Sequence, residues 1–189
     1  MKDQNSAFTL IEVMVVVAII SIVTAMAVPN IIDWLPDHRL KVAVRELYSN
    51  MQFAKLSAVK ENKTWKIFFD AGGYEICSDP GPDGLWGDST PADRVDNIVA
   101  RSVIFEHGIK YGKGSSTKNV SGSAWSSSPP PLAELVSYTP NPVLTLNSRG
   151  TSNSGYIYLD NAKNDRSYCA GTFSTGMIIM KKWNGTDWD

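Results

Sequence analysis

The most prominent pattern along the chain is an apolar run close to its N-terminus. Residues 8–28 read FTLIEVMVVVAIISIVTAMAV, and 17 of these 21 residues are apolar. At about 1.5 Å per residue, a helix of this length extends about 31 Å, which is enough to cross the hydrocarbon core of a bilayer. We therefore predict that residues 8–28 form a membrane-spanning helix.

A cleaved secretory signal is the main alternative for this run. Such a signal places basic residues first, then about 7 to 15 apolar residues, then a cleavage site of small residues. Here Lys2 is the sole basic residue before the run, and residues 28–30 carry no Ala-x-Ala pattern. Cleavage after the run is therefore not expected.

The pattern changes after Pro29 to an apolar stripe with a spacing of three and four residues. The stripe consists of Leu40, Val44, Leu47, Met51, Ala54 and Ala58. This spacing predicts that one helix continues to about Glu61. Because Pro29 lacks a backbone N–H and its ring crowds the preceding turn, we expect a kink near Val28.

Short strand-like runs follow the helix. Residues 64–70 and 74–78, separated by 71–73, predict a β-hairpin. Further predicted strands are 102–106, 109–111, 143–146, 155–159 and 177–183. The sequence thus predicts an α+β fold in which a long, kinked, partly transmembrane helix packs on a small antiparallel β-sheet head.

The strand-rich region is interrupted by a polar segment, residues 113–131. Twelve of its nineteen residues are Ser, Gly or Pro, and such a composition offers little apolar surface to offset the entropy of ordering. We predict a surface insertion that is mobile at least in part. It is not expected to be a domain boundary, because the strand-like material on either side is too short for two cores.

Composition and motifs argue against a catalytic role. The net charge is −1 and the pI is near 6.1, so no global field attracts nucleic acid or anionic lipid. Two histidines and two cysteines cannot supply a four-ligand zinc site of paired motifs. The sequence contains no G-x-S-x-G, H-E-x-x-H or P-loop pattern. We expect neither enzyme activity nor a cofactor.

An acidic loop offers a candidate for calcium binding. Asp79, Asp83 and Asp88 lie among prolines and glycines, and carboxylates on a turning loop are ligands that Ca²⁺ prefers. The spacing fits no EF-hand pattern, and acidic turn-forming residues are common in surface loops. We therefore predict no metal site and keep these three residues as the alternative.

Glu12 is the one charged residue inside the apolar run. An acid at the centre of a membrane helix costs about 2.5 to 3.5 kcal/mol on insertion scales. Either Glu12 reaches the membrane interface, or it pairs with a positive group at the same depth. If the chain were cut between Ala7 and Phe8, the new α-amino group of Phe8 could supply that positive charge on the same or a neighbouring chain.

A short leader ends in a small residue, FTLIE follows it, and Pro29 ends the aliphatic run. This N-terminal region resembles the type IV pilins and the pseudopilins of type II secretion. In that family a prepilin peptidase cuts before the phenylalanine, the new N-terminus is methylated, and the glutamate guides docking of subunits. The resemblance implies cleavage between Ala7 and Phe8, methylation of Phe8 and a docking role for Glu12. Ala7 departs from the glycine that usually precedes the cut.

The rest of the chain resembles the GspH/FimT-type minor pilins and pseudopilins. The resemblance lies in the helix at residues 39–62, the hairpin after it, the LTLNSRG element at 144–150 and the strand STGMIIMKK at 174–182. It implies a leader at 1–7, a membrane or filament-core helix at 8–28, a helix on the head at 29–62 and a β-rich head at 63–189. The branch also implies a low-copy position at or near a filament tip.

The function implied by the resemblance is structural. The chain would be a minor subunit of a type II secretion pseudopilus or a type IV pilus, anchored in the bacterial inner membrane by one span with its head in the periplasm before it enters the filament. Expected partners are other major and minor pilins or pseudopilins, the prepilin peptidase, the inner-membrane assembly platform and membrane lipid.

Two alternative functions remain open. The chain could be a DNA-binding minor pilin, for which the C-terminal region offers Lys181, Lys182 and Trp183. Phosphate binding requires more clustered charge, so we do not expect nucleic acid as a partner. The chain could also be a membrane-tethered binding module that never polymerises.

The two cysteines could form a disulfide in a head that the resemblance places outside the cytoplasm. A bond between Cys77 and Cys169 would close a loop of about 90 residues, which in the entropic account stabilises the fold by about 4 to 5 kcal/mol. Two separate buried thiols are the alternative.

Overall fold

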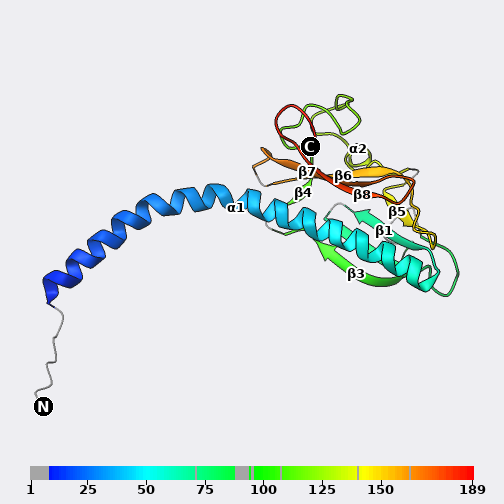
Figure 1. The fold of residues 1–189 in the computed structure, drawn as a ribbon, viewed down its shortest axis with the longest axis horizontal. Coiled ribbons are helices and arrows are strands. Elements are labelled where there is room, and N and C mark those ends of the chain that lie inside the picture. The colour runs from blue at the N-terminus through cyan, green and yellow to red at the C-terminus, as the bar shows by residue number, and fades with distance from the viewer. Residues whose placement is uncertain are drawn as a thin grey trace, which may run out of the picture. The chain divides into compact units, whose positions relative to one another are not determined.

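The computed structural model describes residues 9–70, 72–87, 94, 96–106, 108–139, 141–161 and 163–189. Its elements are α1 (Leu10–Glu61), β1 (Trp65–Asp70), β2 (Gly73–Asp79), β3 (Ile98–Ile104), β4 (Lys110–Tyr111), α2 (Leu132–Leu135), β5 (Val143–Leu146), β6 (Gly155–Asp160), β7 (Ser167–Thr172) and β8 (Ile178–Lys182). Figure 1 shows these elements along the chain. The chain divides into two compact units, Met1–Leu35 and Pro36–Asp189.

The first unit contains the apolar part of α1. The segment Leu10–Val28 has a mean hydropathy of 2.6, is long and apolar enough to cross a membrane, and is not buried by the rest of the chain. Its 19 residues extend about 28 Å as a helix, close to the thickness of bilayer hydrocarbon. The predicted apolar helix is confirmed.

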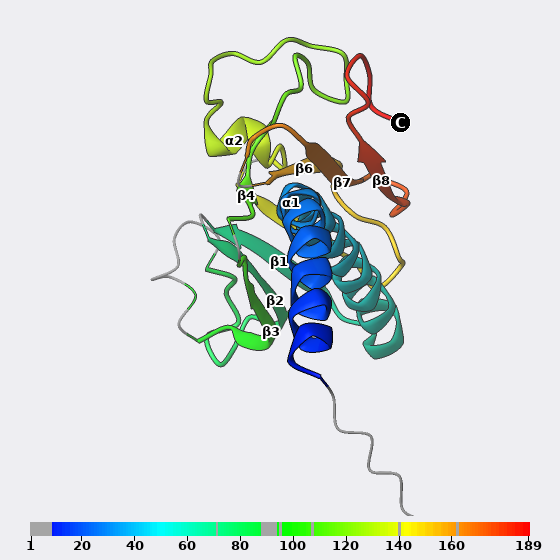
Figure 2. The ribbon, with the colours of Figure 1, turned by 90° about the vertical axis from the view of Figure 1, so that its left-hand side faces the viewer.

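In the second unit, the remaining turns of α1 bury one face. The six residues of the predicted stripe, from Leu40 to Ala58, are all fully buried. This face packs against two four-stranded antiparallel sheets, with strand orders β3-β2-β1-β5 and β4-β6-β7-β8. Figure 2 shows β1, β2 and β3 on one side of the cyan part of α1, and β6, β7 and β8 above it.

The head therefore contains two sheets, where the sequence predicted a single small one. The predicted hairpin is confirmed, because β1 and β2 pair in antiparallel register with Ile67 opposite Ile76. The close approach of β3 requires glycine at position 73, because a Cβ atom there would lie 2.0 Å from the carbonyl oxygen of Val103. The sequence did not predict β7, which is the central partner of both β6 and β8.

Polar contacts fix α1 on the two sheets. The amide of Asn50 is buried and donates a 2.7 Å hydrogen bond to the hydroxyl of Tyr74 on β2. Burial raises the pKa of Tyr74 to about 12, so its hydroxyl stays neutral at physiological pH. On the other side, Lys55 Nζ donates to the carbonyl oxygen of Gly176 at 2.8 Å, in the turn before β8. The helix is thus held in register with both sheets.

The insertion at residues 113–131, predicted to be mobile in part, is packed on the outer face of the second sheet. The ring of Trp125 lies edge-on to Tyr158 at a centroid distance of 4.9 Å, and the backbone N–H of Val120 donates to the Tyr158 hydroxyl at 2.9 Å. Trp188 Nε1 donates to the carbonyl of Lys118 at 2.8 Å. Aromatic residues outside the insertion therefore anchor it.

The structure corrects the disulfide between Cys77 and Cys169, because both are free, buried thiols. They lie in different sheets, Cys77 on β2 and Cys169 on β7. Cys77 belongs to a small cluster with Phe68 and Val143 that is separate from the main core, whereas Cys169 is part of that core. Two separate buried thiols, the alternative, describe the structure.

We predict that Leu47→Ala lowers the free energy of unfolding by about 2 to 5 kcal/mol, because it leaves a cavity in the core. Leu56→Ala is the matched control on the same helix, since Leu56 is 67% exposed, and should change stability by less than about 0.5 kcal/mol. Urea unfolding of the full chain in detergent, followed by tryptophan fluorescence, measures both. Equal effects would contradict the assigned helix orientation.

We also predict that two maleimides attach per unreduced, denatured chain, because both thiols are free. The folded chain should react slowly between about pH 7 and 9, since burial raises the pKa of Cys77 to about 11 and of Cys169 to about 12, and the thiolate is the reactive form. Mass spectrometry counts the adducts. A denatured chain that takes up none without reductant would restore the disulfide.

Candidate functional site

The candidate site is the N-terminal turn of α1 and the apolar surface that follows it. Thr9 caps the helix, because its carbonyl oxygen accepts the N–H of Glu12 at 3.1 Å and of Val13 at 3.3 Å. Its Oγ1 also accepts the Glu12 N–H at 3.3 Å. The first turn of a helix leaves N–H groups without partners, and a threonine side chain at this position satisfies one of them.

Thr9 is a functional residue that our sequence analysis missed. The signal was present, because Thr-x-x-Glu at residues 9–12 has the spacing of a capping box. Glu12 thereby lies in the first turn of α1, where the partial positive charge of the helix N-terminus favours a carboxylate. The motif FTLIE therefore fixes where the helix begins and also positions its acid.

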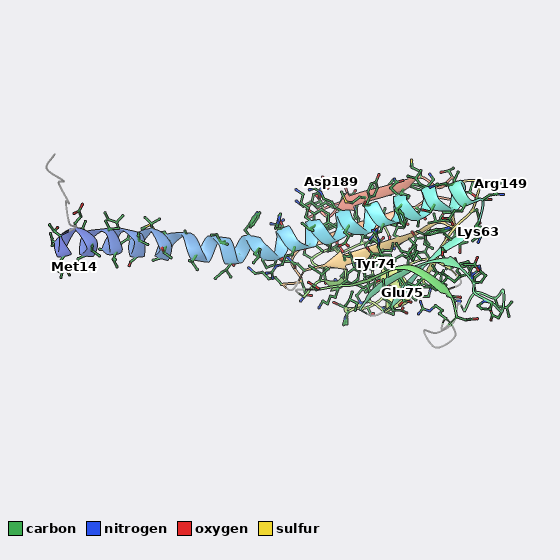
Figure 3. All side chains as sticks on the ribbon, turned by 90° about the horizontal axis from the view of Figure 1, so that it is seen from below. Met14, Lys63, Tyr74, Glu75, Arg149 and Asp189 are labelled. Atoms are coloured by element: carbon green, nitrogen blue, oxygen red, sulfur yellow. The ribbon has the colours of Figure 1, made fainter. Side chains whose placement is uncertain are left out.

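The surface beyond Glu12 is apolar on every side. Figure 3 shows side chains projecting from both sides of the ribbon around Met14. Two polar side chains in the segment bond to their own helix: Ser21 Oγ donates to the carbonyl of Val17 and Thr24 Oγ1 to that of Ile20, each at 2.7 Å. Such internal bonds are what hydrocarbon requires of a hydroxyl group. Glu12 is the segment's one ionisable side chain.

The predicted cleavage site, Ala7 and Phe8, lies outside the described residues, so the ion pair between Phe8 and Glu12 stays a prediction. Within the part of the chain that the structure describes, no basic side chain pairs with the Glu12 carboxylate. α1 continues through Pro29 to Glu61, and the predicted kink stays a prediction as well.

Carboxylates of the acidic loop accept hydrogen bonds from other groups of the chain. Lys63 Nζ lies 2.9 Å from Asp79 Oδ2, and this bond, together with the N–H of Gly81, holds the pKa of Asp79 below its usual range. Asp83 accepts the N–H of Leu85 at 2.8 Å, as in an Asx turn. Asp88 lies outside the described residues. Across the residues that are described, no cluster of three or more His, Cys, Asp or Glu side chains could hold a metal.

The residues considered for nucleic-acid binding contact other residues of the head. Trp183 is 4% exposed and packs against Trp188, so its face cannot stack on a base. Lys181 Nζ donates to the carbonyl of Trp188 at 3.0 Å, and Lys182 Nζ lies 6.0 Å from the ring centroid of Tyr168. These contacts hold Lys181 and Lys182 against the head, so the two side chains do not form an open basic surface.

Comparisons with known proteins agree with this geometry. The prokaryotic N-terminal methylation motif matches residues 2–28, which includes the whole apolar segment. The family described as type II transport protein GspH matches residues 43–176, which includes residues 43–61 of α1 and strands β1 to β7.

The chain is also similar to type IV fimbrial proteins. It is 30% identical over 130 residues to the type IV major fimbrial protein FimA of Dichelobacter nodosus strain VCS1703A, covering 64% of this chain and 75% of that protein. A second FimA from Dichelobacter nodosus matches with the same identity and coverage. No solved structure matches the chain.

The family matches and the fold indicate the same type of protein. A methylation motif ends at Val28, where the apolar segment ends, and the GspH match covers more than half of the chain. The α+β head on a long N-terminal helix is pilin-like. This chain therefore belongs to the GspH family of type II transport proteins, within the pilins and pseudopilins, as a structural subunit.

Proposed function

We propose that this chain is a minor subunit of a type II secretion pseudopilus or a type IV pilus, incorporated at or near the filament tip. It is made as an inner-membrane precursor with its head in the periplasm, cut between Ala7 and Phe8, methylated at Phe8 and drawn into a helical filament. Its partners are other major and minor pilins or pseudopilins, the prepilin peptidase, the assembly platform and lipid.

One observation carries this proposal: an uncovered apolar helix surface with a single acid in its first turn. None of Leu10–Val28 is buried. Exposed to water, an apolar surface of this size is strongly unfavourable, so lipid or neighbouring helices must cover it. A bundle of such helices in a filament core provides that cover without lipid.

Glu12 supplies the direction of assembly in this proposal. In lipid or in a helix bundle its carboxylate requires a positive partner. The α-amino group that cleavage creates at Phe8 is four residues away along the chain, and one on a neighbouring subunit can reach the same depth. Pairing across subunits would set the stagger of one helix against the next.

The relatives support assembly into a filament. The FimA relatives are named type IV major fimbrial proteins, and the GspH family is named for type II transport. The family is structural, and we propose no catalytic role. A membrane-tethered binding module that never polymerises is the competing function, and assembly assays distinguish the two.

Processing provides the first test. Mass spectrometry of the membrane-extracted protein should detect a chain that has lost seven of its 189 residues and begins at N-methylated Phe8. Ala7→Gly should give the same product with a larger processed fraction, whereas the bulky Ala7→Leu should block cleavage. An intact Met1, or a cut after Ala27, would contradict the proposal.

Assembly provides the second test. Glu12→Gln keeps the size of the side chain but removes its charge, and losing one partner of a buried ion pair costs about 3 to 5 kcal/mol. We expect normal membrane insertion and cleavage, with incorporation into sheared pili or cross-linked pseudopili reduced at least about tenfold. Immunoblotting of filament and membrane fractions measures both.

Ser21→Ala is the matched control, because it changes an uncharged residue whose hydroxyl bonds only to its own helix, and it should assemble like the wild type. If the Glu12→Gln chain enters filaments at the wild-type level, the ion-pair account is wrong and Glu12 is an acid at the membrane interface. A wild-type chain that is cut and stays in the membrane without ever entering filaments would instead favour the tethered module.

A further inference from the structure

Among the residues that the structure describes, β3, the outer strand of the first sheet, has no strand partner along one edge. It pairs with β2 on one side and stands last in the strand order β3-β2-β1-β5. Six of its seven residues are exposed, and Ile104 is 76% exposed. Natural edge strands are commonly protected by lysine or proline. β3 contains neither, and its single charged residue is Arg101.

The backbone groups that face this open edge can be assigned. The N–H of Phe105 donates to the carbonyl of Gly72 at 2.8 Å, so it points toward the hairpin of β1 and β2. Backbone groups alternate in direction along a strand. The N–H and C=O groups of Ser102 and Ile104 therefore point away from β2, toward the open edge.

The side chains of β3 that face α1 can be assigned as well. Val103 pairs with Tyr74 and Arg101 pairs with Ile76, and both partners belong to the core around α1. Directly paired residues share a face of the sheet, and Arg101 accordingly donates to Asn50 Oδ1 on α1. Its guanidinium also lies 5.1 Å from the ring centroid of Phe53.

A groove lies beside the edge on this same face. It has a volume of about 450 Å³ and runs between α1 and the end of β3. Its lining is mainly apolar and includes Val42, Ala43, Val103, Phe105 and Ile109. The charges in the lining are mixed, because His38 and Arg39 line the groove together with Glu46 and Glu106. A side chain of an added strand placed next to Val103 would enter this groove.

A second copy of this chain does not complement the charge of the edge. A second β3 strand would bring another Arg101 and no acidic residue, so it would offer no carboxylate to the first Arg101. The occupant is therefore a different polypeptide.

We propose that the β3 edge and its groove bind an extended segment of another protein by strand addition. The segment forms backbone hydrogen bonds with Ser102 and Ile104 and places an apolar side chain in the groove beside Val103. Because Arg101 is the only charged residue of β3, an acidic residue opposite it complements the edge and a basic one opposes it. In this mode backbone bonds supply affinity, and side-chain pockets supply specificity.

The test uses the full chain in detergent micelles and a short labelled peptide of alternating valine and threonine with one central glutamate. We expect saturable binding by fluorescence anisotropy, and slower hydrogen exchange at the amides of Ser102 and Ile104. Ser102→Pro removes an edge N–H without removing a bond to β2, a position at which edge strands tolerate proline. It should weaken binding at least about tenfold.

Three controls keep this test decisive. Ser102→Ala retains the N–H and should bind like the wild type. A peptide with lysine in place of glutamate should bind more weakly. A peptide methylated on the backbone nitrogens of one edge should not bind, and this comparison holds even where Ser102→Pro fails to fold.

Several results would overturn the proposal. They are no binding by the wild type, equal binding by the methylated peptide, or equal binding by a folded Ser102→Pro chain. Protection at the β8 edge in place of β3 would also overturn it. So would self-association of the chain that protects β3 without peptide, because it would make a second copy the occupant. None of these measurements depends on filament assembly.

Discussion

The rest of the structure depends on one helix that meets two different environments. From Leu10 to Val28, α1 is apolar on all sides, and from Leu40 to Ala58 it is apolar on the single face that the two sheets cover. The first pattern requires lipid or other helices around it, and the second requires a folded head. The sheets fold around one end of α1 because that face would otherwise expose its leucines and valines to water. The opposite end has no such cover and governs where the protein can reside.

The long helix and the first hairpin could be predicted because their patterns are local. The pairing of strands that are far apart in the sequence could not be predicted. The stripe from Leu40 to Ala58 and the short break between the two strand-like runs of the hairpin are patterns within a few residues, so their spacing was sufficient. Strand β7 was missed because SYCAGT alternates neither in size nor in polarity. All six of its residues are buried, so the strand lacks the alternation that a half-exposed strand has. The pairing of β1 with β5 joins segments about 75 residues apart, and no local pattern encodes it.

Of the candidate site, the structure confirms that Glu12 lies in the first turn of the apolar helix, whereas the roles of Ala7, Phe8 and Glu12 in cleavage, methylation and docking stay predictions. FTLIE is a contiguous motif, so its acid, its phenylalanine and its helix start are all encoded within five residues. What the sequence analysis did not yield was the capping role of Thr9, which follows from hydrogen bonds at the helix start. The lysines near the C-terminus, which were weighed for nucleic-acid binding, show the same limit. Their charges are visible in the sequence, but their contacts with Trp188 and Tyr168 arise only from the fold.

The hydrogen bonds of the Ser21 and Thr24 hydroxyl groups affect how well a single chain is accommodated in the membrane. Each is satisfied by a carbonyl one turn earlier in its own helix, so neither needs water or a neighbouring helix. In the assembly that we propose, an unassembled chain would therefore have both hydroxyl groups of its span satisfied in lipid. The ionisable group that favours a neighbouring subunit over lipid would be the single carboxylate of Glu12 near one end of the helix, so the exchange between membrane and filament would respond to one charge.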